Sequence, residues 1–330
     1  MSFLHGGRVT LVALLAVAFA AVAALPAGAN PSGTNGQITF ARFNPNLGDT
    51  QVYVVNPDGT GQRLVQAPTD TGECPTWFPD GAHIATCGTP DRPGGGSRII
   101  NPDDGTFREV DGQYPGLFNP CMSPSPDGTL LLCETFSDDG SQNGIHTIRS
   151  SDGGGLTQIT SNPGGDDIPG DWSPNGKRIV FDRIGSDGSS EGLFVVNTNG
   201  TGLKQITPAD FDLSSFGSWS PQGNDIVFSR HVTPDVHSSI WVIHADGTGL
   251  HEINVQPSSA CGGLNADPSA EGCVQPGWSP DGTQIVFSKG HSTEVDAAIY
   301  TVNVDGTGLT KVSSGGGDGT PDWGTHPPVG

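Results

Sequence analysis

Basic residues are scarce in this chain, with 14 lysines and arginines against 35 aspartates and glutamates. The resulting net charge of −21 repels phosphate backbones and anionic lipid, so nucleic acid and acidic membranes are excluded as natural partners. Hydrophobic residues are also few, at 33%, while glycine and proline number 50 and 27. Short apolar runs nevertheless recur between turn residues at regular intervals, which is typical of strands and argues against disorder.

The sequence also lacks an apolar run of about 20 residues, the length that a membrane-spanning helix needs. Its longest run, residues 11–25, follows Arg8 and precedes Ala27-Gly28-Ala29, a small-x-small cleavage signature. This pattern indicates a signal peptide over residues 1–29, cleaved near Ala29, and a single domain over residues 30–330. No cysteine follows the run to carry a lipid anchor. We expect a protein that is secreted or held in the cell envelope, without membrane insertion.

Six cysteines in an exported chain favour disulfides. Two pairs bracket Pro-Asp-Gly turns, and the third flanks an insertion. A bridge that closes a loop of this size stabilises the fold by about 3 kcal/mol, mainly by restricting the unfolded chain. The expected pairs are Cys74 with Cys87, Cys121 with Cys133, and Cys261 with Cys273.

A five-residue phrase recurs along the chain and is complete in Trp278-Ser279-Pro280-Asp281-Gly282. Successive copies start 47, 48, 47 and 59 residues apart, and a second phrase of the type Asp-Gly-Thr-Gly trails them. A fixed period in this range marks an array of identical supersecondary units. The copies begin at Trp77, Pro124, Trp172, Trp219 and Trp278.

Each repeat unit predicts four antiparallel strands, which we name A to D. The five-residue phrase ends strand A, and an apolar strand B such as Ile179-Val180-Phe181 follows it. Strand C, as in residues 298–303, leads into the trailing phrase. Asp-Gly and Asn-Gly reverse the chain tightly, because these residues adopt positive φ at low cost, and strand D follows. The predicted class is therefore all-β.

The two ends of the repeat array complement each other. Gln37-Ile38-Thr39-Phe40 matches strand B with no strand A before it, and Pro321-Asp322-Trp323-Gly324 matches strand A with no strand B after it. A ring in which the strand with Trp323 completes the first unit leaves no open sheet edge. The trailing phrases then predict a six-bladed β-propeller. An open solenoid is the alternative, and it would leave both half-units unpaired.

The phrases resemble the PD40 or WD40-like repeats of TolB-type β-propellers over residues 36–324. The Gly-His and Trp-Asp dipeptides of the eukaryotic WD40 signature do not occur at repeat positions. The resemblance implies a six-bladed ring and a place in the bacterial envelope, where TolB binds a lipoprotein and is exploited by colicins. The α/β domain that precedes the TolB propeller is not expected here, which argues against the envelope-maintenance role.

Similar repeats form the gating propellers of prolyl oligopeptidases, where a separate domain carries the chemistry. One Gly-x-Ser-x-Gly string is present, Gly188-Ser189-Ser190-Glu191-Gly192, in a polar loop between strands B and C. A nucleophile elbow needs a strand, a sharp turn and a helix, and no helix follows the string. We interpret it as a chance match.

Most repeated residues have a structural interpretation. The repeated tryptophans are expected to pack between blades, and turn aspartates such as Asp281 to bond the backbone of their own turn. No EF-hand loop or His-Glu-x-x-His motif is present. The densest histidine group spreads over a loop and two strands, so we expect surface residues rather than a metal site. It consists of His231, His237, His244 and His251.

The two faces of the predicted ring differ. Turns A to B and C to D share one face, the turn face, and keep their length, whereas the variable B-to-C and D-to-A connections share the other, the loop face. Variable loops on a rigid scaffold commonly carry binding sites. The loop face is acidic, which suits a cationic ligand or merely keeps the protein soluble. Its acids are Asp70, Glu73, Asp91, Asp138, Asp139, Asp166, Asp167, Asp187, Glu191, Asp210, Asp212, Asp235, Asp267, Glu271, Glu294, Asp296 and Asp318.

Two aspartates precede tryptophans on inner strands, Asp171 and Asp322. With Asp166, Asp167 and Asp318, they are expected near the loop-face mouth of the central channel. Several carboxylates that converge there could hold a hard cation such as Ca²⁺.

The favoured function is a monomeric, secreted, non-enzymatic propeller that binds a protein or another ligand, cationic in character, through its acidic loop face. The alternative is an extracytoplasmic hydrolase or lyase that uses channel-mouth carboxylates with a divalent metal. A third hypothesis is a structural or adhesive surface component. No nucleophile and base pair is evident in the sequence, which favours binding over catalysis.

Ring closure is testable by truncation. Deleting residues 319–330 removes the strand that completes the first unit, so the melting temperature should fall greatly. Thermal unfolding followed by circular dichroism measures the change, and an unchanged melting temperature would contradict the ring.

Overall fold

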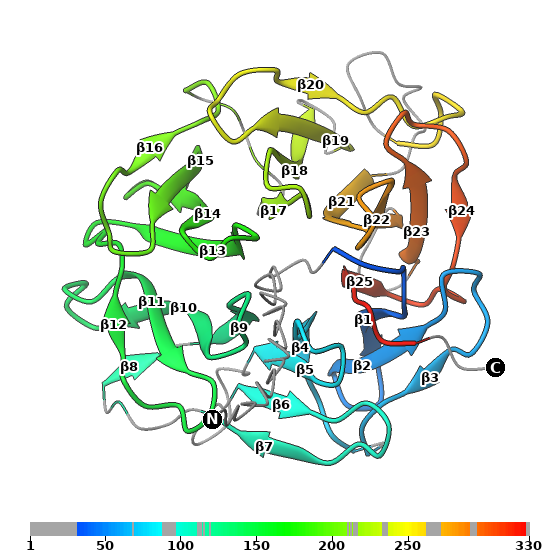
Figure 1. Cartoon of the computed structure of the whole chain (residues 1–330), viewed down its shortest axis with the longest axis horizontal. Coiled ribbons are helices and arrows are strands. Elements are labelled where there is room, and N and C mark those ends of the chain that lie inside the picture. The colour runs from blue at the N-terminus through cyan, green and yellow to red at the C-terminus, as the bar shows by residue number, and fades with distance from the viewer. Residues whose placement is uncertain are drawn as a thin grey trace, which may run out of the picture.

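The computed structural model describes residues 32–67, 69–87, 97–110, 114, 116–118, 120–209, 211, 213, 217–232, 237–261, 272–290 and 296–327. Within these ranges 25 strands form six antiparallel sheets, arranged as a ring around a central channel (Figure 1). The described residues contain no helix, and hence none of the length and hydropathy that crossing a membrane requires. The predicted all-β six-bladed propeller is confirmed.

The six blades are numbered in chain order, and each is given from its inner strand outward. Blade 1 consists of β25 (Asp318–Trp323), β1 (Ile38–Asn44), β2 (Asp49–Val55) and β3 (Arg63–Leu64). Blade 2 consists of β4 (Glu73–Trp77), β5 (Ile84–Cys87), β6 (Arg98–Ile100) and β7 (Phe107–Glu109). Blade 3 consists of β9 (Cys121–Pro124), β10 (Leu130–Ser137), β11 (Gly144–Arg149) and β12 (Thr157–Gln158). Blade 4 consists of β13 (Asp166–Trp172), β14 (Arg178–Ile184), β15 (Ser190–Asn197) and β16 (Lys204–Gln205). Blade 5 consists of β17 (Ser218–Trp219), β18 (Asp225–Val232), β19 (His237–His244) and β20 (His251–Glu252). Blade 6 consists of β21 (Gly272–Trp278), β22 (Gln284–Gly290), β23 (Ala298–Asn303) and β24 (Thr310–Lys311). In blade 3, β8 (Leu117–Phe118) also pairs with the far end of β10.

The C-terminal strand closes the ring, as predicted. β25 pairs with β1 so that Trp323 lies opposite Ile38. The closure continues into blade 2, because the ring of His326 stacks on Trp77 with centroids 5.1 Å apart. Nδ1 of His326 also donates a hydrogen bond to the carbonyl oxygen of Gly81 at 2.6 Å. The chain after β25 therefore fastens blade 1 to blade 2.

The repeated tryptophans pack between blades. Trp77, Trp219 and Trp323 are at most 1% exposed. The indole of Trp172 in blade 4 donates to the carbonyl oxygen of Ser123 in blade 3 at 3.2 Å, and Trp278 in blade 6 does the same to Ser218 in blade 5. These side chains are structural, as expected.

Blade 3 lacks this tryptophan, and blade 2 compensates. Pro124 stands opposite Leu131 on strand B, the position that tryptophan takes in the other blades. The phrase in blade 2 has Phe78 where the others have serine, and the Phe78 ring is buried in one cluster with Leu131 and Ile148 of blade 3. Two departures from the repeat therefore fill one interface together.

Two of the three expected disulfides form, Cys121–Cys133 and Cys261–Cys273, which fits an extracytoplasmic location. The prediction for Cys74 and Cys87 is wrong in this structure, where both are free. Cys121 lies opposite Cys133, but Glu73 lies opposite Cys87. A bulge displaces Cys74 from the register and gives it a φ of 47°. Spacing along the sequence does not reveal a bulge.

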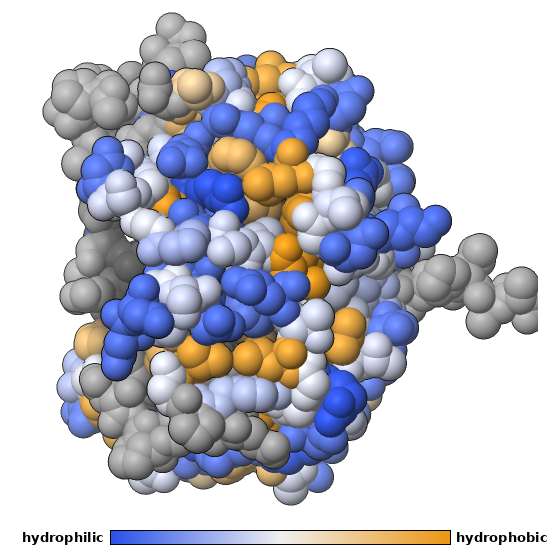
Figure 2. Space-filling model, turned by 90° about the vertical axis from the view of Figure 1, so that its left-hand side faces the viewer, coloured by the Kyte–Doolittle hydropathy of each residue, from blue (hydrophilic) through white to orange (hydrophobic). Residues whose placement is uncertain are grey.

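The surface agrees with the composition. Figure 2 shows hydrophilic residues over most of the described part of one side of the ring, with apolar residues confined to narrow strips. The apolar side chains lie instead in clusters between neighbouring blades. Interblade packing therefore forms the core.

The packing of Phe78 against blade 3 can be tested by replacing its side chain. Phe78→Ser should lower the free energy of unfolding by about 3 kcal/mol, because it removes a buried aromatic ring from the interface of blades 2 and 3. Phe107→Ser is the control, since Phe107 is 43% exposed, and it should cost less than about 1 kcal/mol. Urea unfolding measures both values, and equal losses would contradict the assignment.

Candidate functional site

The inner strands of all six blades enclose a cavity of about 110 Å³ in the channel. The strand position before the inner-strand tryptophan, or before Pro124 in blade 3, lines this cavity in every blade. Four of the six residues are small or carry a hydroxyl, and two are carboxyls. In blade order they are Asp322, Thr76, Ser123, Asp171, Ser218 and Gly277. The two carboxyls therefore belong to blades 1 and 4, which lie opposite each other in a six-membered ring.

Each channel aspartate caps backbone groups. An inner strand is the edge of its sheet, so its channel-side N–H groups lack a strand partner. Asp171 accepts hydrogen bonds from the backbone N–H of Trp172 at 2.7 Å and of Trp219 in the next blade at 3.1 Å. Asp322 accepts from the N–H of Trp77, also in the next blade, at 2.7 Å. Both carboxyls thus join neighbouring blades while facing the cavity.

Burial raises the pKa of both channel aspartates. The pKa of Asp171 rises to about 7, chiefly because protein surrounds the carboxyl and also because Asp322 bears a like charge across the channel. Burial raises the pKa of Asp322 to about 6. Both side chains keep a small exposed fraction, and since both line the cavity, their protonation state can respond to what occupies it.

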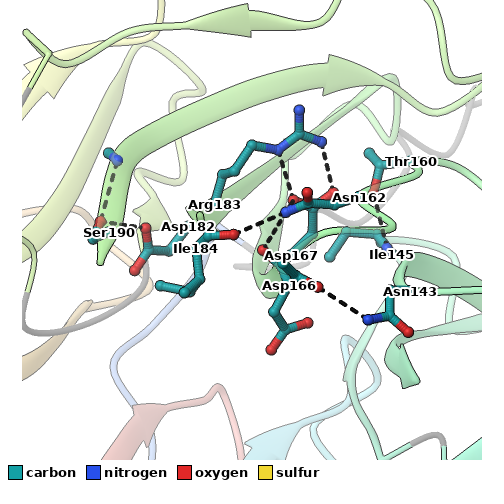
Figure 3. A network of polar contacts seen from close by, with 12 residues as sticks. Asn143, Ile145, Thr160, Asn162, Asp166, Asp167, Asp182, Arg183, Ile184 and Ser190 are labelled. Carbon is teal, nitrogen blue, oxygen red and sulfur yellow. Dashed lines mark hydrogen bonds and ion pairs between the residues drawn. The ribbon is translucent and has the colours of Figure 1, made fainter. Parts of the chain in front are cut away.

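Two further members of the predicted calcium set are held in ion pairs. Asp167 makes a bidentate pair with Arg183, with N–O distances of 2.7 and 2.8 Å (Figure 3). Asp318 makes the equivalent pair with Arg42 in blade 1. Both carboxyls are fully buried, and the guanidinium of Arg183 lies 5.2 Å from the ring centre of Phe194. These pairs connect strands A and B within each blade.

Asp166 lies beside a carboxyl that the sequence did not single out. Burial raises the pKa of Glu134 on β10 to about 9, and a hydrogen bond with Asp166 of the next blade adds to this. The Asn162 amide donates to the main-chain oxygen atoms of Asp166 and Ile184 at 2.9 and 3.0 Å, and so fixes this end of β13 (Figure 3). Glu134 and Asp166 form a hydrogen-bonded carboxyl pair between blades 3 and 4, and both have raised pKa values.

The five aspartates proposed for calcium thus occupy three places. Asp171 and Asp322 line the cavity, Asp167 and Asp318 pair with arginines, and Asp166 pairs with Glu134. Across the described ranges, no three His, Cys, Asp or Glu side chains gather in a geometry that would hold a metal ion. The histidines do not gather either: His244 pairs with Asp225, and the side chain of His237 lies outside the described residues.

Glu73 and Glu134 also have raised pKa values. Burial and the nearby charge of Asp49 raise the pKa of Glu73, at the start of β4. Glu134 directly follows the apolar run Leu130-Leu131-Leu132-Cys133, and a charged residue in that place is the signal that could have identified it. Several acids of the predicted loop face lie outside the described residues, namely Asp91, Asp210, Asp212, Asp235, Asp267, Glu271 and Glu294.

The turn aspartates behave in the opposite way. Asp58 accepts hydrogen bonds from the backbone N–H and the hydroxyl of Thr60 at 2.9 and 2.7 Å, and these bonds lower its pKa. Asp305 repeats the arrangement with Thr307. The turns therefore hold aspartates used for structure, whereas two of the carboxyls with raised pKa values, Asp171 and Asp322, line the channel. The Gly-x-Ser-x-Gly string is structural as well, since its Ser190 begins β15 and bonds Asp182.

Solved structures share this architecture. TolB from Acinetobacter baumannii superposes with a TM-score of 0.67 at 18% identity, over 89% of this chain and 67% of that one. A protein assigned as TolB from Agrobacterium tumefaciens gives 0.64 at 22% identity, over 87% and 92%. The chain has the fold of these propellers. An oligogalacturonate lyase in complex with manganese gives 0.53 at 12% identity, over 81% and 71%. The sequence matches no family model and no curated protein.

Because the pKa values of Asp171 and Asp322 are raised in the folded protein, we expect the protein to be most stable at mildly acidic pH. Their pKa values in the folded state lie above those in the unfolded chain, so their stabilising contribution is complete below about pH 4 and is lost as the pH rises through about 6 and 7. The melting temperature should therefore fall between about pH 5 and about pH 8.

Thermal unfolding across this range measures the slope. Asp171→Asn and Asp322→Asn should flatten it, because neither amide titrates. Asp138→Asn is the control, since Asp138 is an exposed loop-face acid outside the channel, and it should leave the slope unchanged. A melting temperature that rises with pH in the wild type would contradict the assignment.

Proposed function

We propose that this protein is an extracytoplasmic, non-enzymatic binding module that recognises a cationic segment of another protein at the loop-face mouth of its channel. One observation carries the proposal: two of the carboxyls with raised pKa values line the channel cavity, and all five lie in blades 1 to 4. They are Glu73, Glu134, Asp166, Asp171 and Asp322. Perturbed carboxyls concentrate at functional sites, and a bound cation would relieve their mutual repulsion.

Two nearby cations are already neutralised. Arg42 on β1 and Arg183 on β14 are each paired with a buried aspartate of their own blade. The net charge of −21 adds a long-range attraction for positive partners. Electrostatic complementarity of this kind favours fast association and selects against acidic partners. The structural similarity to TolB propellers is compatible with a binding role.

An extracytoplasmic lyase or hydrolase is the second candidate, and the Glu134–Asp166 pair favours it. Two hydrogen-bonded carboxyls with raised pKa values are an arrangement used in general acid–base catalysis. The structurally similar oligogalacturonate lyase is named for an anionic sugar chain. Such a substrate would be repelled by the carboxyls around this channel unless a divalent metal bridged them. Charge therefore favours the cationic partner.

The binding proposal predicts affinity for cationic peptides. A tetralysine peptide should bind at about 20 mM salt and dissociate as salt screens the charges, whereas a tetraglutamine peptide should not bind. Replacing Glu73 and Asp166 by their amides should weaken binding at least about fivefold. Isothermal titration calorimetry measures each affinity.

A matched control removes the same number of charges elsewhere. Asp104→Asn with Glu109→Gln neutralises two exposed acids of blade 2 that are not in the cavity lining, and binding should stay within about twofold of wild type. Equal losses in both double variants would show a general charge effect. Turnover of an oligogalacturonate by the protein with added manganese would support the lyase instead.

A further inference from the structure

We propose that Cys74 and Cys87 form an exchangeable dithiol, which a small disulfide entering the channel oxidises to a third bridge. The inference is independent of the proposed function, because it concerns a covalent modification of blade 2 and not a bound partner. It also differs from the permanent bridge that the sequence spacing predicted, since the structure holds both side chains as thiols.

The two thiols are in contact at the loop-face end of blade 2. Cys74 lies near the start of β4, and Cys87 ends the neighbouring strand β5. Their side chains are hydrogen-bonded to each other. Glu73 is the residue directly opposite Cys87, so the contact with Cys74 runs diagonally across the bulge. Side chains already in contact can be bonded by a small adjustment of that bulge.

Blade 3 contains a comparable pair in a different register. Cys121 lies three residues before Pro124, just as Cys74 lies three residues before Trp77. Cys121 stands directly opposite Cys133, and the two are bridged. In blade 2 the second cysteine lies one residue further along strand B. A bridge across this offset deforms the strand pairing, and strained bridges are reduced more readily than relaxed ones. The blade 2 pair is therefore the exchangeable one.

Cys74 is reachable from the channel, whereas Cys87 is not. Cys74 is half-buried and lines the cavity of about 110 Å³ together with Pro75 and Thr76. Cys87 is only 6% exposed. A cavity of this volume holds roughly three or four water-sized groups, which admits one end of a small disulfide but not the active site of a protein oxidant. The oxidant is therefore a low-molecular-weight disulfide, and it reacts first at Cys74.

Oxidation takes two exchange steps that balance in atoms and electrons. The thiolate of Cys74 attacks one sulfur of the external disulfide RSSR, and the first RS⁻ leaves. The thiolate of Cys87 then attacks Sγ of Cys74 in this mixed disulfide and displaces the second RS⁻. The two displaced thiolates take up the two protons that the cysteines release. One RSSR is thus reduced to two RSH while the two cysteines are oxidised to one bridge.

The second step is the slower one. The hydrogen bond with Cys74 and the burial of the side chain raise the pKa of Cys87, and the charges of Glu73 and Glu134 act in the same direction. The thiolate is the attacking form, so Cys87 attacks slowly near neutral pH. A mixed disulfide at Cys74 is therefore the expected intermediate.

The inference is tested with cystamine, a small disulfide. The purified protein is treated mildly with dithiothreitol, freed of the reagent and exposed to cystamine, and its free thiols are then alkylated. Mass spectrometry of unreduced peptides should show Cys74 and Cys87 alkylated before cystamine and linked after it, with the other two bridges intact throughout. In redox buffers, reducing this pair should need at least about a tenfold lower ratio of reduced to oxidised dithiothreitol than either other bridge.

Two matched variants identify the thiol that reacts first. Cys87→Ser should stop at the mixed disulfide and carry one cysteamine unit on Cys74, because no second thiol displaces it. Cys74→Ser should take up no cysteamine, because its remaining thiol at Cys87 is buried. Circular dichroism establishes that both variants are folded, and if one is not, the peptide map and the redox titration of the wild type decide.

Three results would overturn the inference. They are alkylation of both cysteines in the wild type after cystamine, reduction of all three bridges at the same dithiothreitol ratio, and cysteamine uptake by Cys74→Ser as fast as by Cys87→Ser. None of them bears on the binding of tetralysine, so the proposed function would stand or fall separately.

Discussion

The pairing of β25 with β1 is the contact on which the rest of this structure depends. Five blades take all four strands from consecutive sequence, but blade 1 takes its inner strand from the other end of the chain. Without that strand, blade 1 has an open edge and the channel has a gap. The same strand brings Thr320, Pro321 and Asp322 to the cavity. Stability and the candidate site therefore rest on one strand, and the contact of His326 with Trp77 extends its hold to blade 2.

The candidate site lies at a channel-facing strand position whose residue differs between the blades. Each blade offers the same strand position to the channel, and most blades place a small or hydroxyl-bearing residue there. Blades 1 and 4 place aspartate instead, and the same two blades hold the buried pairs of Arg42 with Asp318 and Arg183 with Asp167. This gives a sixfold scaffold a twofold distribution of charge. A ligand between opposite blades would meet the same chemistry on both sides.

Aspartate has two distinct roles in this acidic protein, and its surroundings decide between them. In the turns, backbone and threonine donors hold the carboxylate ionised, as for Asp58. In the channel, burial removes most of the water around the carboxyl and a like charge faces it, so Asp171 resists ionisation despite two backbone hydrogen bonds. The stabilising contribution of the channel aspartates is lost as the pH rises through about 6 and 7, whereas that of the turn aspartates is lost at low pH. Composition alone does not distinguish these groups.

The fold could be predicted from the sequence because the same pattern of strands and turns recurs in each blade. The position of each Pro-Asp-Gly turn, the strands after it and the complementary ends around Ile38 and Trp323 determine six blades and their closure, since each is a local pattern or a count. The candidate site followed only in part. Asp171 and Asp322 were placed at the channel by strand position, and both line it.

Only the tertiary structure decided how the remaining acids are used. Asp167 and Asp318 meet arginines across the sheet, and Asp166 meets Glu134 from the neighbouring blade. These partners come from different strands, so sequence spacing does not report them. The bulge in β4, which leaves Cys74 and Cys87 as free thiols in contact with each other, is likewise not visible in sequence spacing. Local patterns determine which strands form, whereas contacts between strands and between blades determine which side chains remain available to a ligand.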